Sequence, residues 1–183
     1  MKKFLGVLFA VVLLFGLSAC SLFGGKNEEN GGNNGGSNGG NSIFNSTKTL
    51  TCTKTEVDED DGSKTENTVV VTYKGDSIKK IVNTSVSDLE AEYVEFAISL
   101  GKAIAEEFNK VNGLTITYSA TNSGNALKVE TIIDCENLDV SALSELTEDL
   151  VDENSIESSF YNAKDTKIDD LKKEIEEDGF TCK

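Results

Sequence analysis

The chain has 183 residues, of which 32 are acidic and 17 are basic, so its formal charge is −15. Every basic residue is a lysine, and the sequence contains no histidine, arginine, tryptophan or proline. Without histidine, neither a Ser-His-Asp or Cys-His catalytic group nor a histidine-based zinc site can be built, and the negative charge excludes a nucleic-acid partner.

The N-terminal segment has the pattern of a bacterial export signal. Met1-Lys2-Lys3 is a short positive stretch, and residues 4–17 form an almost uninterrupted apolar run. A helix that spans a bilayer needs about 20 apolar residues, so this shorter run favours a signal peptide over a permanent transmembrane helix. We therefore expect residues 1–19 to be removed on export.

The apolar run ends in Leu17-Ser18-Ala19-Cys20, which closely resembles the bacterial lipobox. The resemblance implies cleavage between Ala19 and Cys20, attachment of diacylglycerol to the Cys20 thiol and, as an optional further step, acylation of the freed amine. Two or more acyl chains anchor a protein stably. The expected location is therefore the extracytoplasmic face of the cell membrane, with the membrane as a partner through Cys20. A non-lipidated signal peptide with a chance cysteine is the alternative.

Residues 24–42 consist of glycine, asparagine, serine and a few charged residues. They contain no apolar side chain whose burial could offset the entropy lost on ordering, so we expect a disordered tether that spans roughly 25 Å. Aggregation or binding by this Gly/Asn-rich stretch is the alternative interpretation. The expected organisation is a signal peptide at 1–19, a lipidated cysteine and tether at 20–42, and one folded domain at 43–183.

The first half of the domain predicts an antiparallel meander. Residues 48–57, 67–74 and 77–86 are rich in threonine, valine and isoleucine, which is typical of strands. The charged stretch 58–64 and the Gly75-Asp76 pair between them are short turn sequences, which favour antiparallel neighbours.

A long amphipathic helix is predicted next. Ser87-Asp88-Leu89-Glu90 has the pattern of a capping box and predicts the helix start, and Asn112-Gly113 predicts its end. Between them apolar residues recur at steps of three and four, which predicts one buried stripe on a helix of about 24 residues. The stripe consists of Leu89, Tyr93, Phe96, Leu100, Ile104, Phe108 and Val111.

The remaining segments complete an α+β domain. Residues 114–118 and 126–134 predict a hairpin of two further strands, and 141–151 predicts a short helix. A last helix begins at Thr166, and residues 180–183 add a short strand beside the first one. We expect an antiparallel sheet of about five strands, with one long amphipathic helix and one or two shorter helices packed on one face.

Three cysteines remain in the domain, in a compartment where disulfides form. Cys52 lies near the start of the domain and Cys182 at its end, whereas Cys135 shares the apolar face of a predicted strand, which is typical of a buried thiol. We predict a Cys52–Cys182 disulfide, which closes nearly the whole domain and stabilises it by about 4–5 kcal/mol in a chain-entropy treatment. A redox-active pair is the alternative, although the sequence has no Cys-x-x-Cys motif.

Several short motifs resemble the YehR-like family of small bacterial lipoproteins. They are Val71-Thr72-Tyr73-Lys74-Gly75-Asp76, the long amphipathic helix, Gly113-Leu114, the segment from Ile133-Asp134 to Leu138-Asp139-Val140, and Gly179-Phe180. The resemblance covers most of residues 50–183 and implies the fold and the location. The family has no assigned activity, so the resemblance implies no catalytic residue, and Cys52 and Cys182 go beyond the family's core pattern.

The acidic residues offer candidate metal and catalytic sites that their spacing does not support. In the run 58–62, neither register places glycine at the sixth and an acidic residue at the twelfth position of a calcium loop. We interpret this run as a solvated turn, with a weak cation site as the alternative. The carboxylates at 148–153 and 174–178 crowd helix surfaces without aromatic residues to bind a sugar, and we interpret them as solvated. We therefore expect no catalytic residue, no metal site, no cofactor and no enzymatic activity.

Three functions stay open at this point. The first is a binding or interaction module at the cell envelope, whose partner is an unknown small molecule, peptide or envelope protein. The second is a structural or accessory envelope lipoprotein without a soluble ligand. The third is a hydrolase that uses carboxylates or an unpaired Cys135.

Overall fold

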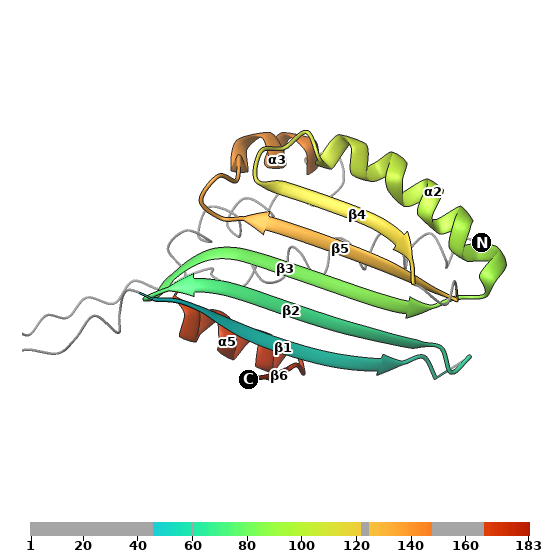
Figure 1. Cartoon of the computed structure of the whole chain (residues 1–183), viewed down its shortest axis with the longest axis horizontal. Helices are drawn as coiled ribbons and strands as arrows, with labels where there is room; N and C mark the ends of the chain where they lie inside the picture. Colours follow the sequence, from blue (N-terminus) through green and yellow to red (C-terminus); the bar gives the residue numbers. More distant parts are fainter. Residues whose placement is uncertain (1–45, 60, 122–124, 148–166) are drawn as a thin grey trace, which may run out of the picture.

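The computed structural model describes residues 46–59, 61–121, 125–147 and 167–183. The predicted signal peptide, Cys20 and the tether lie outside these residues. No helix in the described part of the chain is long and apolar enough to cross a membrane. The elements, labelled in Figure 1, are the strands β1 (Thr47–Val57), β2 (Lys64–Lys74), β3 (Ser77–Asp88), β4 (Leu114–Ala120), β5 (Ala126–Asp134) and β6 (Thr181–Cys182), and the helices α2 (Ala91–Phe108), α3 (Val140–Thr147) and α5 (Ile168–Glu177).

The strands form one antiparallel sheet in the order β4-β5-β3-β2-β1-β6. β1, β2 and β3 are the predicted meander, and β4 and β5 are the predicted hairpin. Pairing of β5 with β3 joins the two parts. The prediction of an α+β fold is confirmed, with six strands in the described residues where about five were expected.

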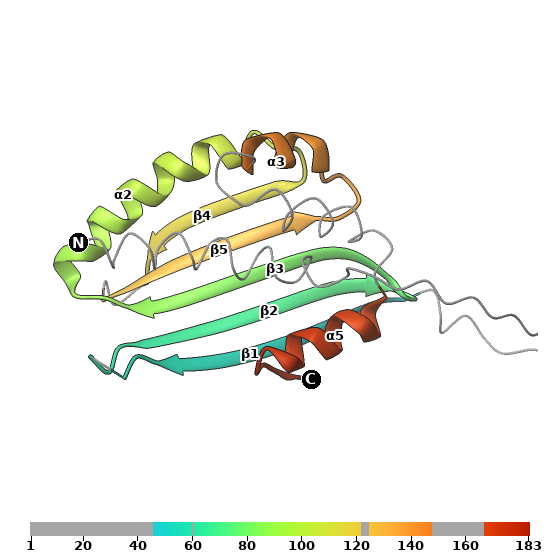
Figure 2. The ribbon, with the colours of Figure 1, turned by 180° about the vertical axis from the view of Figure 1, so that it is seen from behind.

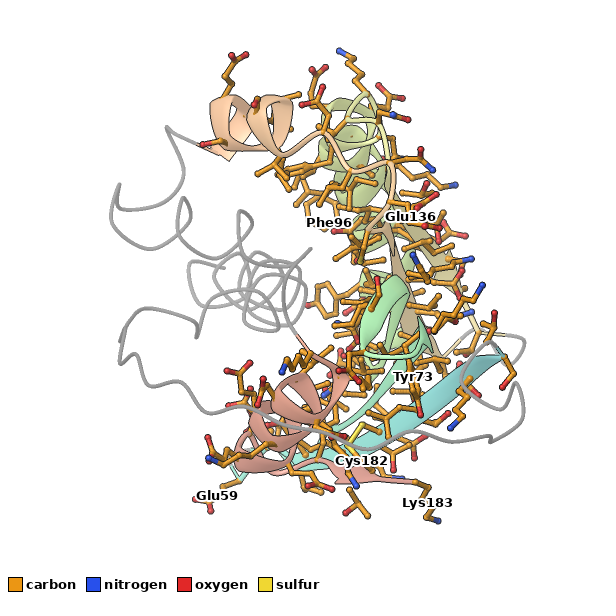
Figure 3. All side chains as sticks on the ribbon, turned by 90° about the vertical axis from the view of Figure 1, so that its left-hand side faces the viewer. Glu59, Tyr73, Phe96, Glu136, Cys182 and Lys183 are labelled. Carbon is orange, nitrogen blue, oxygen red and sulfur yellow. A yellow bond between two sulfur atoms is a disulfide. The ribbon has the colours of Figure 1, made fainter. Side chains whose placement is uncertain are left out.

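The helices gather on one side of the sheet, which we call the inner face. α2 packs along β4, and α5 lies at the opposite end, over β1 (Figure 2). α3 and α5 project from the same side of the sheet (Figure 3). Apolar side chains of the inner face and of all three helices form one core, which includes Leu50, Val69, Val71, Ile81, Ile116, Ile133, Phe108, Leu143, Leu171 and Ile175.

Alternation along the strands explains why threonine-rich segments pair so well here. In β1, Leu50 and Cys52 are buried on the inner face, while Thr49, Thr51 and Thr53 point outward and are exposed. β-Branched threonine favours extended backbone and tolerates water on its outer side. The predicted strand assignments in this half of the domain are confirmed.

α2 begins later than the capping-box pattern predicts. Its first residue is Ala91, and the side chain of its N-cap residue, Glu90, makes no capping hydrogen bond. Ser87 and Asp88 instead continue β3, where Thr65 Oγ1 donates a 3.1 Å hydrogen bond to Ser87 Oγ. The predicted helix start was wrong because pairing on both sides of β3 outweighs a local cap.

The buried face of α2 is displaced from the predicted stripe. Tyr93 is 45% exposed and Phe96 is 65% exposed. A Cβ built on Gly101 would fall 2.3 Å from Tyr118 Cδ1, so the helix lies too close to β4 to admit a large side chain there. The predicted stripe was therefore wrong over its first turns. The residues that α2 buries are Val94, Ala97, Gly101, Ala105 and Phe108.

α2 ends at Phe108, earlier than predicted, because Asn109 ties the end of the helix to β4. Asn109 Oδ1 accepts a hydrogen bond from the Ile116 N–H at 2.6 Å, and its Nδ2 donates one to the Ile116 carbonyl at 3.0 Å. Gly113, where the helix was predicted to end, instead lies between α2 and β4 and has a φ of 81°. A Cβ at Gly113 would lie 2.5 Å from the Leu138 backbone, so glycine is required for both reasons.

The two shorter helices agree with the predicted segments where the structure describes them. α3 ends at Thr147, and residues 148–151 of the predicted helix lie outside the described residues. α5 begins at Ile168, and the predicted start at Thr166 also lies outside them. β6 pairs with β1, as predicted for the end of the chain.

Candidate functional site

Four polar residues are buried side by side on the inner face of the sheet. Asn67 of β2 is 1% exposed, Ser85 and Asn83 of β3 are 4% and 8% exposed, and Thr131 of β5 is 8% exposed. The register pairs Asn67 with Ser85 and Asn83 with Thr131 across neighbouring strands. We call these four residues the inner-face polar cluster.

Three atoms of this cluster have no hydrogen-bond partner in the described part of the chain: Asn67 Oδ1, Asn83 Oδ1 and Ser85 Oγ. Asn67 Nδ2 donates a 3.2 Å hydrogen bond to Glu56 Oε2, which fixes the orientation of this amide and leaves its oxygen as an acceptor. A buried polar atom without a partner costs about 1–3 kcal/mol, so three in one cluster are a substantial burden for a small domain.

A bonded polar network borders the cluster on the side of the β1–β2 turn. Glu56 Oε1 forms an ion pair of 2.9 Å with Lys54 Nζ. Lys54 Nζ also lies 5.8 Å from the centre of the Phe180 ring. Lys54 is therefore already engaged by a carboxylate and an aromatic ring.

Glu174 of α5 carries the fourth buried side-chain atom without a partner in the described residues, Oε2. Burial, together with the nearby carboxylates of Glu177, Asp178 and Asp170, raises the pKa of this carboxyl to about 7. Glu174 is thus a carboxyl that changes its charge near neutral pH.

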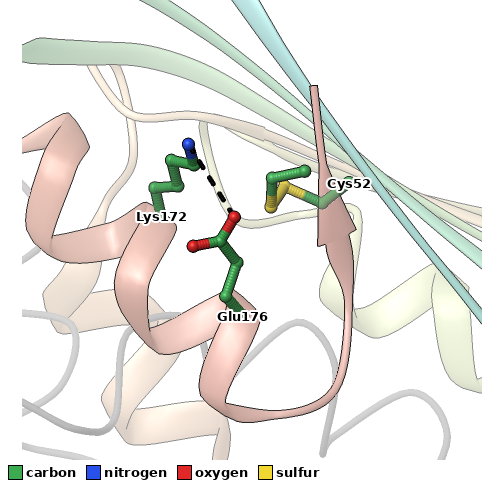
Figure 4. The surroundings of a disulfide bond; sticks show 4 residues. Cys52, Lys172 and Glu176 are labelled. Atoms are coloured by element: carbon green, nitrogen blue, oxygen red, sulfur yellow. Dashed lines mark ion pairs between the residues drawn. A yellow bond between two sulfur atoms is a disulfide. The ribbon is translucent and has the colours of Figure 1, made fainter.

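Helix geometry places Glu174 on the flank of α5 that faces the middle of the sheet. Lys172 and Glu176 form an ion pair of 3.8 Å beside the disulfide at the β1–β6 edge (Figure 4). Glu174 is two residues from each, and a step of two residues turns the helix by about 200°. Because Lys172 and Glu176 lie on the flank beside the β1–β6 edge, Glu174 lies on the opposite flank, on the β2 side of the helix.

The chemistry available here is recognition by hydrogen bonding. Amide and carboxylate oxygens accept hydrogen bonds, and a serine hydroxyl can accept or donate one. In the described residues no three Cys, Asp or Glu side chains are arranged to hold a metal ion. The cluster was missed in the sequence because the segments 67–74 and 77–86 were recognised by their β-branched residues. The available signal was that Asn67, Asn83 and Ser85 fall on the inward positions of those strands.

The disulfide predicted between Cys52 and Cys182 is present in the structure, with an S–S distance of 2.04 Å and a sequence separation of 130. The cysteines face each other on β1 and β6. The neighbouring Thr51 and Lys183 exchange backbone hydrogen bonds of 3.1 and 2.9 Å. Cys52 and Cys182 therefore form the closer, non-hydrogen-bonded type of pair, with their Cα atoms 4.0 Å apart.

The third cysteine is a buried core residue, and the acidic run forms a hydrogen-bonded turn. Cys135 is buried, as predicted, and burial raises the pKa of its thiol to about 11, so it is a poor nucleophile near neutral pH. In the acidic turn, Gly62 N–H donates to the Asp58 carbonyl at 2.9 Å, and Ser63 N–H donates to Asp61 Oδ1 at 2.8 Å. These bonds make a compact turn with Gly62 at a φ of 74°.

A hollow of about 220 Å³ lies at the other end of β1, next to the N-terminus of α5. Lys48, Tyr73 and Asp76 line it together with Asp169 of the first turn of α5. Because two carboxylates face one lysine, the hollow offers no anion site at the helix terminus.

No protein-family model matches the chain, and no curated protein matches its sequence. Two solved structures match the chain. The NMR structure of Escherichia coli YehR is 15% identical and matches 76% of this chain and 93% of YehR with a TM-score of 0.52. The NMR structure of a protein from Streptococcus pneumoniae TIGR4 is 20% identical and matches 87% of this chain and 99% of that one with a TM-score of 0.49. At such identities the likeness to YehR concerns the fold alone.

Proposed function

We propose that this chain is a lipid-anchored extracytoplasmic binding module, whose ligand is held on the inner face of the sheet. The observation that carries the proposal is the inner-face polar cluster, with three buried atoms that lack partners in the described residues. A scaffold without a ligand is more stable with apolar residues at such positions. Binding of a ligand that supplies the missing hydrogen bonds would explain why polar residues occupy these buried positions.

The lipobox-like sequence before Cys20 supports the anchored location, and the disulfide suits an oxidising compartment outside the cytoplasm. The tether at 24–42 would hold the domain away from the lipid headgroups. With the two lysines of the signal removed, the formal charge of the mature protein is −17, which favours neutral or cationic ligands over anionic ones.

Native mass spectrometry of the full-length protein, extracted from membranes in mild detergent, tests both parts of the proposal. We expect the loss of residues 1–19, the addition of diacylglycerol at Cys20, one disulfide, and a stoichiometric extra mass from a bound ligand. The Asn83→Leu variant is the matched control and should lose that extra mass while it keeps the lipid. An unmodified Cys20 would contradict the anchor, and a protein that is always bare would contradict the ligand.

A second candidate function, an accessory envelope lipoprotein without a soluble ligand, is favoured by the exposed side chains of α2. Phe96 is 65% exposed and Tyr93, one turn earlier, is 45% exposed. Neighbouring exposed aromatic residues suit contact with another protein. Crosslinking from position 96 in intact cells would identify such a partner, and a bare protein in the mass spectrum together with a specific crosslink would favour this role.

A further inference from the structure

Most of the buried atoms without a partner at this site are hydrogen-bond acceptors. In the described residues, the buried side-chain atoms without a partner belong to Asn67, Asn83, Ser85 and Glu174. Asn67 Oδ1 is an acceptor because Nδ2 of the same amide is bound to Glu56. An ionised Glu174 carboxylate is also an acceptor, and Ser85 can serve either way. A ligand that completes these bonds must therefore bring hydrogen-bond donors.

The charges around the site favour a donor that is also a cation. Of the two described lysines of β1 on this face, Lys48 lies at the far end beside the hollow, and Lys54, next to the cluster, is already engaged by Glu56 and the Phe180 ring. The charged groups that act on Glu174 are Glu177, Asp178 and Asp170, which add negative charge, and Lys173. A group with several N–H donors and a positive charge matches this environment.

The register brings Glu174 to the level of the asparagines. Lys172 and Glu176 lie beside Cys52 (Figure 4), and Glu174 belongs to the same turn of α5. Cys52 pairs with Val69 in β2, and Val69 pairs with Asn83 in β3. Glu174, on the flank of α5 opposite the β1–β6 edge, therefore lies on the β2 side of the helix, at the level of the row that contains Asn83.

We infer that the inner-face polar cluster and Glu174 together bind the protonated primary amine of a small ligand, an inference that rests on the binding function proposed above. The ammonium group donates to the oxygens of Asn67 and Asn83 and forms an ion pair with the Glu174 carboxylate. Its three N–H groups match three of the acceptors left without partners. Ser85 is left to bind a neighbouring polar atom of the ligand.

NMR titration of the lipid-bearing protein in detergent tests the inference at pH 8. The probes are n-butylammonium, tetramethylammonium, which has the same charge but no N–H donor, and n-butanol, which has a donor but no charge. We expect n-butylammonium to shift the side-chain amide signals of Asn67 and Asn83 saturably, and the other two probes to bind at least about tenfold more weakly.

Variants separate a specific site from general attraction to an acidic protein. Glu174→Gln and Asn83→Leu should each weaken n-butylammonium binding about tenfold or more. Glu176→Gln, which removes a carboxylate from the opposite flank of the same helix, should leave the binding unchanged. Folding of each variant is checked in the same spectra. Equal effects of Glu174→Gln and Glu176→Gln would overturn the assigned site.

The outcomes distinguish this inference from the binding function on which it rests. If n-butanol shifts the same amides as strongly as n-butylammonium, the amine assignment is wrong and the binding function stands. The same conclusion follows if no probe binds but the membrane-extracted protein carries an extra mass that Asn83→Leu removes. If no probe binds, and nuclear Overhauser contacts show the cluster filled by other residues of the same chain, both proposals are wrong.

Discussion

Asn83 lies in the middle of the sheet and is only 8% exposed, and its side-chain oxygen Oδ1 has no hydrogen-bond partner in the described residues. Its strand neighbour Val69 is buried and apolar on the same face. An apolar side chain of similar volume would fit this position without the loss of solvation. The energetic conflict at Asn83 is therefore the clearest sign that the site serves something other than stability.

Asn83→Leu should raise the free energy of unfolding by about 1–2 kcal/mol, because it removes an unsatisfied buried acceptor. Asn67→Leu is the contrasting variant. It removes the hydrogen bond to Glu56 as well as the unsatisfied oxygen, so we expect no gain. Urea unfolding of the ligand-free protein measures both values. A large loss of stability in Asn83→Leu would mean that Asn83 makes an essential structural bond.

Glu174 predicts a dependence of stability on pH. Its pKa is raised from the ordinary value of 4.5 to about 7 in the folded protein, chiefly by burial. The folded state therefore holds a proton that the unfolded state has released, and the contribution of this group to stability falls as pH rises from about 4.5 through 7. Because the carboxyl is partly exposed, we discount the effect to about 1 kcal/mol.

Glu174→Gln should accordingly be more stable than the parent protein at pH 8 by about 1 kcal/mol and equal to it at pH 4. Urea unfolding at pH 4, 6 and 8 checks the prediction. Glu176→Gln controls for the loss of any carboxylate from α5. A stability difference that does not change with pH would contradict the assigned pKa.

At the scale of elements, α2 shows how close packing selects small side chains. Gly101 faces the ring of Tyr118, which is 4% exposed, and a Cβ there would lie 2.3–2.5 Å from three ring atoms. Glycine lowers helix stability by about 1 kcal/mol relative to alanine. The contact with β4 offsets this cost, because it buries the aromatic ring under the helix backbone.

Gly101→Ala should therefore destabilise the domain by about 1–3 kcal/mol, although alanine is the better helix former. Ser99→Ala, at an exposed position of the same helix, should be neutral or slightly stabilising. Thermal unfolding of the two variants compares them directly. Stabilisation by Gly101→Ala would show that Tyr118 moves aside at little cost.

The helices and strands that are determined by neighbouring residues in the sequence were predictable, and those that depend on tertiary contacts were not. Alternating threonine and valine identified β1 and β2, and the cysteine positions identified the disulfide. The start of α2 was not predictable, because Ser87 has a local preference for a cap and a stronger tertiary preference for pairing in β3. The buried face of α2 depends on its distance from β4, which sequence periodicity does not contain.

The candidate site was harder to predict from the sequence than the fold was. Asparagine is usually found in turns, so Asn67 and Asn83 within strands carry no familiar motif. Their significance appears only when the register places them beside Ser85 and Thr131. In the proposed amine site Glu174 adds a carboxylate from α5, a distant part of the sequence.

At the scale of the whole molecule, the last residues of the chain protect the edge formed by the first strand. β6 is two residues long and pairs with β1 only at Cys52–Cys182 and Thr53–Thr181. Without β6, β1 would present a long row of unpaired backbone groups, which favours aggregation. The disulfide fixes β6 in this position and holds α5 over the core through Leu171 and Ile175.

Removal of the disulfide in the Cys52→Ala/Cys182→Ala double variant should lower the free energy of unfolding by about 4–5 kcal/mol, because a closed loop of this length restricts the unfolded chain strongly. Wild-type protein in reductant should match the double variant. Cys135→Ala, which deletes a buried thiol, should cost only about 1–2 kcal/mol. Urea unfolding with and without reductant measures all three.

Because the loop contains both the inner-face polar cluster and α5, the double variant should also lose ligand affinity, whereas Cys135→Ala should keep it. Retained affinity in the double variant would show that core packing alone positions Glu174 over the sheet.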